Sequence, residues 1–178
     1  FKKVIHVSWN IEKIKKISKC HYTIYPNQNN IISNIIPISL LNLENINLGL
    51  THPKKIFLGQ PLSEIDLRFT SKYINKILNK IGISYYYPHP RENTPVSFKN
   101  INIIQSNKII EDYLLELSKD STIELYTFFS TAVINLVNTP NIKCYVLYNE
   151  QLLSKFNNLY DIFKHSNITL IQVNDFNE

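Results

Sequence analysis

From residue 54 onward, short apolar runs alternate along the chain with longer segments in which apolar side chains recur at helical spacing. The short runs predict buried strands over residues 55–58, 83–87, 102–104, 122–127, 143–147 and 169–173. The longer segments predict helices over residues 63–82, 108–119, 130–138 and 151–165. This alternation predicts an α/β fold with a mostly parallel sheet and helices on both faces.

The first 50 residues do not follow this alternation. They combine Asn-rich turns with an apolar stretch that contains Pro37. We interpret residues 1–50 as the tail of a preceding lobe and a linker, and residues 51–178 as the α/β domain. The chain begins at Phe1 and contains no methionine. We therefore expect it to be a segment of a longer protein, whose other lobe is missing here.

The composition is that of a globular protein, with 44% apolar and 19% charged residues among 178. A formal charge of +5 predicts an anionic partner, such as a phosphate, a nucleotide, a nucleic acid or a lipid headgroup. The chain has two cysteines, Cys20 and Cys144, and Cys144 lies inside an apolar run, so we expect reduced thiols with Cys144 buried. No apolar run reaches the roughly 18 residues that predict a membrane-spanning helix.

Several chemistries find no support in the sequence. A GxGxxG or Walker motif is absent, which disfavours dinucleotide and P-loop chemistry. No cluster of His and Cys has the spacing of metal ligands, and no serine lies in a nucleophile elbow. We therefore expect neither a metal site nor acyl chemistry.

Candidate site residues follow the predicted strands, because ligands of open α/β sheets bind at the carboxyl ends of the strands. The residues there are Gly59, Gln60, Pro88, His89, Pro90, Glu111, Phe129, Ser130 and Thr131. Arg91 and Glu92 come directly after Pro90. Arg91 pairs either with a phosphate or with Glu92.

His89 and Ser130 are the most informative of these candidates. His89 stands between two prolines, which restrain the backbone and aim the imidazole. Such a histidine can donate to a phosphate and supply a proton to a leaving group; the alternative is a rigid surface turn. Ser130 is expected to cap the next helix, whose first N–H groups can bind phosphate. The alternative is that Ser130 is a cap only.

Glu64 and Asp66 stand at the start of the helix predicted over residues 63–82. Acidic residues favour the helix dipole there without any further function. The functional interpretation is that one of the two deprotonates an incoming hydroxyl group.

Four segments, in this order and at workable spacings, carry a resemblance to a known family. They are residues 56–61 (IFLGQP), 87–91 (YPHPR), 110–113 (IEDY) and 124–130 (ELYTFFS). Residues 21–25 (HYTIY) add to it. From about Lys19 onward the chain resembles the C-terminal half of the lipooligosaccharide sialyltransferases of Gram-negative pathogens, glycosyltransferase family 52.

The resemblance implies a two-lobed GT-B enzyme that moves sialic acid from CMP-sialic acid to a terminal sugar of a lipooligosaccharide. Transfer would invert the anomeric carbon and need neither a metal ion nor another cofactor. This chain would be the Rossmann-like nucleotide-binding lobe, and the missing N-terminal lobe would hold the glycan acceptor. The implied location is the cytoplasm, with no nucleic-acid partner. A homodimer and peripheral attachment to the inner membrane stay open.

The resemblance also implies roles for the candidates. His89 would meet the donor phosphate and assist the departure of CMP. Ser130 and the N–H groups behind it would bind the same phosphate, and Glu111 would bind ribose hydroxyls. The remaining nucleotide-binding candidates are Gly59, Gln60, Pro88, Pro90, Phe129 and Thr131.

The chain departs from the family pattern at the general base. In that pattern an acidic residue directly follows the Gly-x-Pro turn, whereas Leu62 occupies this position here. The base is therefore Glu64 or Asp66, with a slight preference for Asp66. Two rival functions stay open. One is a hexosyltransferase of the same fold with another nucleotide-sugar donor, and the other is a non-catalytic nucleotide- or RNA-binding module.

Overall fold

The computed structural model describes residues 10–26, 29–38, 52–92 and 98–173. The chain divides into two compact units, residues 1–42 and residues 43–178. We describe each unit by itself. Residues 39–51, which include the predicted boundary between residues 50 and 51, lie outside the described residues.

The smaller unit contains one helix and two short strands. These are α1 (Ile11–Ile17), β1 (His21–Thr23) and β2 (Ile35–Pro37), and the two strands pair in parallel. Asn10 caps α1, because its side chain accepts a hydrogen bond from the Glu12 N–H at 2.9 Å. Helix α1 buries no residue and β1 buries only Thr23. The described part of this unit therefore has little core of its own.

The larger unit is built on a six-stranded sheet in which every pair of neighbours is parallel. The strands are β3 (Lys54–Leu58), β4 (Tyr85–Tyr87), β5 (Asn102–Ile103), β6 (Ile123–Thr127), β7 (Ile142–Tyr148) and β8 (Thr169–Gln172). Their spatial order is β5-β4-β3-β6-β7-β8, which is the Rossmann order. The predicted parallel sheet is confirmed. The strand order reverses between β3 and β6, so the ligand crevice is expected at their carboxyl ends.

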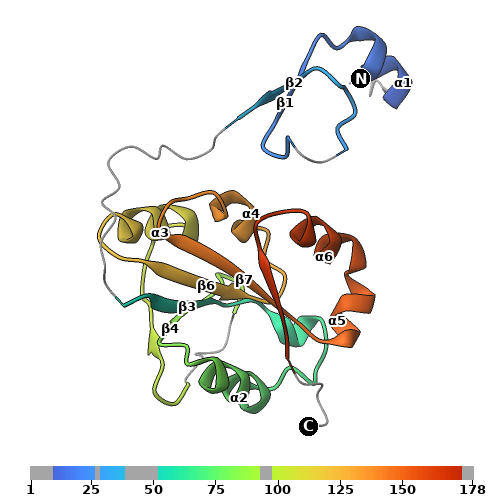
Figure 1. Ribbon diagram of the computed structural model, residues 1–178. Coiled ribbons are helices and arrows are strands. Elements are labelled where there is room, and N and C mark those ends of the chain that lie inside the picture. Colours follow the sequence, from blue (N-terminus) through green and yellow to red (C-terminus); the bar gives the residue numbers. More distant parts are fainter. Residues whose placement is uncertain (1–9, 27–28, 39–51, 93–97, 174–178) are drawn as a thin grey trace, which may run out of the picture. The chain divides into compact units, whose positions relative to one another are not determined.

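Helices cover both faces of the sheet, as predicted (Figure 1). Helix α2 (Ser71–Ile81) lies on one face, and α3 (Ile110–Ser118), α4 (Ala132–Leu136) and α6 (Asn157–Lys164) lie on the other. A short 3-10 helix, η1 (Leu62–Glu64), follows β3, and α5 (Glu150–Lys155) follows β7. This division follows from the strand order, because right-handed crossovers in opposite directions put their helices on opposite faces.

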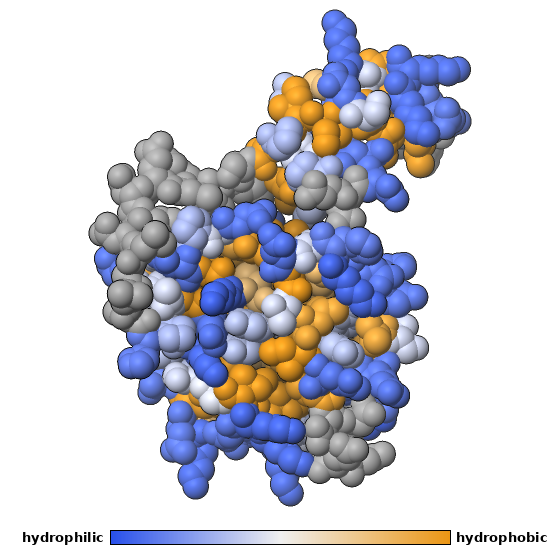
Figure 2. All heavy atoms as spheres, viewed as in Figure 1, coloured by the Kyte–Doolittle hydropathy of each residue, from blue (hydrophilic) through white to orange (hydrophobic). Residues whose placement is uncertain are grey.

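Helix α2 is amphipathic and has clear ends. It buries Ile74, Ile77 and Leu78 and exposes its lysines, and Figure 2 shows hydrophilic side chains at the lower border of the larger unit, where α2 lies. The Thr70 hydroxyl accepts from the Tyr73 N–H at 3.2 Å at its start. Gly82 ends the helix with a φ of 77°, a conformation that favours glycine.

An aromatic cluster joins the carboxyl ends of the central strands. Phe57 is fully buried, stacks on Tyr86 with ring centroids 5.7 Å apart, and meets the Phe128 ring edge-on at 5.8 Å. Phe128 also meets Phe69 at 5.4 Å. The loops that follow β3, β4 and β6 therefore start from a rigid base.

The helix predicted over residues 63–82 is wrong in its first half. The Asp66 carboxylate accepts from the Arg68 backbone N–H at 2.9 Å and pairs with the Arg68 guanidinium at 2.5 Å. A local side-chain bond of this kind competes with helix formation. As a result, Glu64 belongs to η1, Asp66 lies in a loop, and α2 begins only after Thr70.

Two further helices are shorter than predicted. The helix predicted over 151–165 is divided at Phe156, whose φ of −123° and ψ of 33° lie outside the helical region. The Phe156 ring stacks on Phe129 at 5.0 Å, a long-range contact that periodicity cannot reveal. The helix predicted over 130–138 covers only Ala132–Leu136, and Thr131 rather than Ser130 is its N-cap residue.

Candidate active site

A cavity of about 710 Å³ opens beyond the carboxyl ends of β3, β4, β5 and β6, beside α3. We call it the His89 cavity. Its lining brings together five of the residues named from the sequence, namely Pro88, His89, Pro90, Glu111 and Ser130. It lies at the sheet edge where doubly wound α/β proteins bind their ligands.

Three hydrogen bonds hold His89 in a tight turn after β4. Its backbone N–H donates to Glu92 Oε2 at 2.8 Å, and its carbonyl accepts from the Glu92 N–H at 2.9 Å. The ring Nδ1 accepts from the Arg91 N–H at 3.1 Å. When Nδ1 is an acceptor, the proton of the neutral ring is on Nε2. The turn therefore sets the tautomer and leaves Nε2–H as the donor toward a ligand.

Ser130 and Glu111 reach the same cavity from other elements. Ser130 precedes α4, and its hydroxyl accepts from the Ala132 N–H at 3.3 Å. Glu111 lies in the first turn of α3, where the Asn135 side chain donates to its Oε1 at 3.2 Å. The cavity thus offers an imidazole, a hydroxyl and a carboxylate to one ligand. This set suits a phosphate flanked by hydroxyl groups.

The segment between β5 and α3 also lines the His89 cavity, and the sequence-based candidates did not include it. The lining residues from this part of the chain are Ile103, Ile104, Gln105, Ser106, Asn107, Lys108, Ile109 and Ile110. The Tyr87 hydroxyl donates to the Lys108 carbonyl and fastens the segment to β4. A strand was predicted over 102–104. The carboxyl end of this strand lies at the same sheet edge. The expectation that ligands bind at the carboxyl ends of strands, which indicated His89, therefore also indicates this segment.

Gln60 lies at the reversal point of the sheet and does not line the His89 cavity. Its Oε1 accepts from the Thr127 hydroxyl at 2.9 Å and from the N–H groups of Phe128 and Phe129, each at 3.1 Å. Gln60 is 7% exposed. It therefore joins the loop after β3 to the loop after β6.

Glu92 is mostly buried behind the His89 turn. Its Oε1 accepts from the Tyr86 hydroxyl at 2.6 Å, and its carboxylate also bonds the backbone of Gln60. Burial raises the pKa of the Glu92 carboxyl above its ordinary value, and the hydrogen bonds that it accepts offset this only in part. The pair between Arg91 and Glu92 that the sequence left open is replaced by a pair between Arg91 and Glu64.

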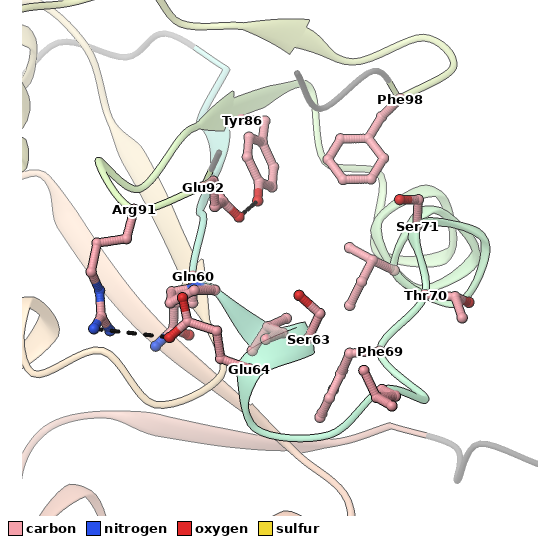
Figure 3. Close-up of a pocket in the computed structure, with 14 residues that line it drawn as sticks. Gln60, Ser63, Glu64, Phe69, Thr70, Ser71, Tyr86, Arg91, Glu92 and Phe98 are labelled. Carbon is pink, nitrogen blue, oxygen red and sulfur yellow. Dashed lines mark hydrogen bonds and ion pairs between the residues drawn. The ribbon is translucent and has the colours of Figure 1, made fainter. Parts of the chain in front are cut away.

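A second cavity, of about 460 Å³, lies next to Gln60 and Glu92 on the side of α2. We call it the Glu64 cavity. Figure 3 shows Glu64 and Arg91 facing each other at its rim, with a carboxylate–guanidinium distance of 3.9 Å. Both side chains are more than half exposed, and Leu67 beside them is 85% exposed. Glu64 therefore presents an accessible carboxylate at the rim of a cavity separate from the one that His89 lines.

Asp66 lies in a different place, at a third cavity formed with α5. Its contacts to Arg68 lower the pKa of its carboxyl to about 2. The carboxylate is therefore a weak base and is engaged in its own loop. Of the two acids named from the sequence, only Glu64 lines a cavity that also contains Gln60, Arg91 and Glu92.

Three remaining candidates lie outside the described lining of the His89 cavity. Gly59 is buried against Tyr86 and Glu92. Phe129 is half-buried on Phe156, and Thr131 is exposed at the N-cap of α4. Their contacts indicate that they shape the sheet edge around the cavity.

Other features of the described segments bear on the chemistry. There, no three His, Cys, Asp or Glu side chains gather into a possible metal site, and no helix combines the length and apolarity needed to cross a membrane. Cys20 and Cys144 are both free thiols. Burial raises the pKa of Cys144 to about 12, so this thiol is a small buried group and not a nucleophile.

Comparison with known proteins gives one consistent result. The sequence model of Glycosyltransferase family 52 matches residues 1–151. An N-acetyllactosaminide alpha-2,3-sialyltransferase of Haemophilus influenzae is 34% identical over 162 residues, which cover 91% of this chain and 51% of that protein. A CMP-N-acetylneuraminate:beta-galactoside alpha-2,3-sialyltransferase of Pasteurella multocida is 30% identical over 168 residues, which cover 94% of this chain and 54% of that protein.

A third relative, an N-acetyllactosaminide alpha-2,3-sialyltransferase of Neisseria meningitidis, is 27% identical over 186 residues, covering 98% of this chain and 48% of that protein. The chain spans about half the length of these relatives. The family match covers most of the chain and includes the His89 turn, Glu111 and Ser130. The chain belongs to glycosyltransferase family 52.

Proposed function

We propose that this chain is the donor-binding part of a two-lobed, GT-B sialyltransferase that uses CMP-sialic acid without a metal ion. The observation that carries the proposal is the His89 cavity at the carboxyl ends of four strands. The His89 imidazole, the Ser130 hydroxyl and the Glu111 carboxylate line it together. Membership of a family whose relatives are named as alpha-2,3-sialyltransferases supports the choice of sugar. The acceptor is then a glycan, held with the help of a second lobe.

The walls of the His89 cavity suit a nucleoside monophosphate. Pro88, Pro90, Ile104 and Ile109 supply apolar surface for a pyrimidine base, and the volume of about 710 Å³ is in the range of small-molecule sites. Glu111 is assigned to the ribose hydroxyls, since Asn135 leaves its second carboxylate oxygen for a ligand. His89 and Ser130 are assigned to the phosphate.

The chemistry follows from the donor. A sialic acid donor carries its leaving phosphate on a tertiary anomeric carbon, so the bond to the phosphate breaks ahead of attack by the acceptor. Negative charge then builds on the departing phosphate. The Nε2–H of His89 and the hydroxyl of Ser130 stabilise that charge by donating hydrogen bonds to the phosphate of the leaving CMP.

Glu64 is the better candidate for the base that receives the acceptor proton. It is accessible at the rim of the Glu64 cavity, whereas Asp66 is engaged by Arg68 and has a pKa of about 2. Geometry thus reverses the slight preference for Asp66 drawn from the sequence. Arg91, at 3.9 Å, holds the Glu64 carboxylate close to the His89 turn.

Nucleotide titration tests the proposal. In the full-length protein, CMP should raise the melting temperature in the presence of EDTA. At a CMP concentration a hundredfold above Kd, the free energy of unfolding should increase by about 2.7 kcal/mol. UDP and GDP should give no comparable shift. A shift with UDP or GDP but none with CMP would instead indicate a hexosyltransferase. Tight binding of RNA without any of the three nucleotides would indicate the nucleic-acid module.

A further inference from the structure

The Glu92 carboxylate lies at the junction of three chain segments that are separate in the sequence. It accepts from the Tyr86 hydroxyl on β4 at 2.6 Å and from the His89 N–H in the following turn at 2.8 Å. Its third partner is the backbone of Gln60, after β3. Figure 3 shows the dashed Tyr86–Glu92 bond, with Gln60 in the loop that leads from β3 to η1. This carboxylate therefore connects the His89 turn to the loop after β3.

Gln60 continues the connection to the loop after β6. Its Oε1 accepts three hydrogen bonds from residues 127–129, directly before Ser130. Gln60 and Thr127 are both at least 93% buried, so these bonds are shielded from water. Together, Glu92 and Gln60 form a continuous bridge from His89 to the loop that carries Ser130.

The close packing around this bridge explains a glycine. A Cβ atom at position 59 would stand 2.6 Å from Glu92 Oε2 and 2.6 Å from the Tyr86 hydroxyl. Real Cβ contacts are not that short, so any side chain at 59 displaces the carboxylate or the ring. Glycine at this position therefore lets the Glu92 carboxylate approach the β3 backbone.

We propose that Glu92 and Gln60 are positioning residues, which hold His89 and Ser130 at the separation that a leaving phosphate requires. The inference rests on the proposed function, because it assigns both groups to one phosphate. Neither Glu92 nor the Gln60 side chain lines the His89 cavity, so both act through their neighbours. Misplacement of a catalytic group by about 1 Å can cost about a hundredfold in rate.

The test compares variants of the full-length protein in donor turnover and CMP affinity. Glu92→Ala should lower kcat by about tenfold or more and change the Kd of CMP by less than about threefold, because the nucleoside walls are untouched. Glu92→Gln should recover kcat to within about fivefold of the parent. Its amide oxygen accepts from the His89 N–H, and its amide N–H donates to the Tyr86 oxygen.

Glu124→Ala is the matched control. Glu124 accepts from the Tyr126 hydroxyl at 2.9 Å, just as Glu92 accepts from Tyr86, but it lies within β6 and its described ion pair is with Lys55 on β3. We expect Glu124→Ala to lower the melting temperature and leave kcat within about twofold. Gln60→Met removes the amide oxygen but fills the same space, and it should lower kcat by about tenfold. It tests the same inference independently if Glu92→Ala does not fold.

An NMR titration gives a readout besides activity. The His89 ring signals should shift in Glu92→Ala and in Gln60→Met, but not in Glu124→Ala. A kcat within threefold of the parent in both Glu92→Ala and Gln60→Met overturns the inference. Glu92→Gln as inactive as Glu92→Ala also overturns it, because Glu92 would then be a proton-transfer group. Failure of the parent itself to bind CMP counts against the proposed function instead.

Discussion

The two cavities beside the Gln60–Glu92 bridge differ in how their polar groups are held. In the His89 cavity, the imidazole stands in a turn fastened by two prolines and three hydrogen bonds. In the Glu64 cavity, the Glu64 side chain is 54% exposed, and its one described ion pair, with Arg91, is 3.9 Å long. Leu67, at the same rim, is 85% exposed. One site is preorganised within this unit, and the other is open.

This difference matches two separate tasks in the proposed enzyme, stabilisation of the leaving phosphate and acceptance of a proton from the acceptor. Stabilising a leaving phosphate requires donors that are fixed before the reaction, since reorganising them would cost free energy at the moment of bond breaking. Accepting a proton from an incoming hydroxyl only requires a reachable carboxylate. The His89 cavity is therefore expected to respond strongly to substitution, and the surroundings of the Glu64 cavity less so.

The largest expected effect comes from His89. In the full-length enzyme, His89→Ala should lower kcat by about a hundredfold or more, because it removes the hydrogen-bond donor that stabilises charge on the departing phosphate. Circular dichroism and the melting temperature should stay near those of the parent, since the turn lies outside the core. Activity within a few-fold of the parent would reduce His89 to a turn residue and remove the central catalytic assignment.

The second largest effect is expected from Glu64→Gln, which should lower kcat by about a hundredfold because it removes the proposed base. Asp66→Asn is the matched control and should change turnover by no more than a few-fold, because its carboxylate is engaged by Arg68. Steady-state kinetics with the glycan acceptor measures both. The reverse result, with Asp66→Asn inactive and Glu64→Gln active, would restore the assignment that the sequence favoured.

Substitution of Ser130 should reduce CMP affinity more than it reduces the stability of the fold. Ser130→Ala should weaken CMP binding by about 1.5–3 kcal/mol, the worth of a charge-assisted hydrogen bond. It should also cost about 1 kcal/mol of stability, because it removes the hydrogen bond that the Ser130 hydroxyl accepts from the Ala132 N–H. Ser130→Gly should lose the same affinity, because it removes the same hydroxyl group. Unchanged CMP affinity in Ser130→Gly would limit the role of the hydroxyl to its hydrogen bond with the Ala132 N–H.

The smallest effect is expected from Gly59, which stands between Leu58 of the His89 cavity and Gln60 of the Glu64 cavity. Gly59→Ala should cost about 1–3 kcal/mol of stability through overpacking against Tyr86 and Glu92. Gly82→Ala is the control, since a Cβ there meets nothing within 4 Å and is strained only by its φ of 77°, at about 1–2 kcal/mol. Denaturant unfolding compares the two. Only Gly59→Ala should also lower kcat, because it displaces Glu92. Equal kcat values in the two variants would show that packing at Gly59 does not affect the site.

Much of the fold could be predicted from local patterns, whereas parts of the site could not. The parallel sheet and helices on both faces follow from apolar periodicity, and residues 88–90 stand out because two prolines bracket a histidine. The start of α2 was misplaced because the Asp66–Arg68 contact interrupts a segment whose apolar spacing continues to look helical. The division of residues 150–164 at Phe156 depends on a ring contact with Phe129, 27 residues earlier.

The sequence by itself determined the order of the elements, the family, and the identity of His89, Glu111 and Ser130 as candidates. Such features depend on residues close together in the chain, where periodicity and short motifs act. Only the tertiary structure decided which groups meet. It brought the Gln60 amide to residues 67 positions or more away, turned Glu92 toward Tyr86 instead of Arg91, and separated Glu64 from Asp66. These contacts arise when strands distant in sequence become neighbours, because packing and hydrogen-bond satisfaction then select the partners.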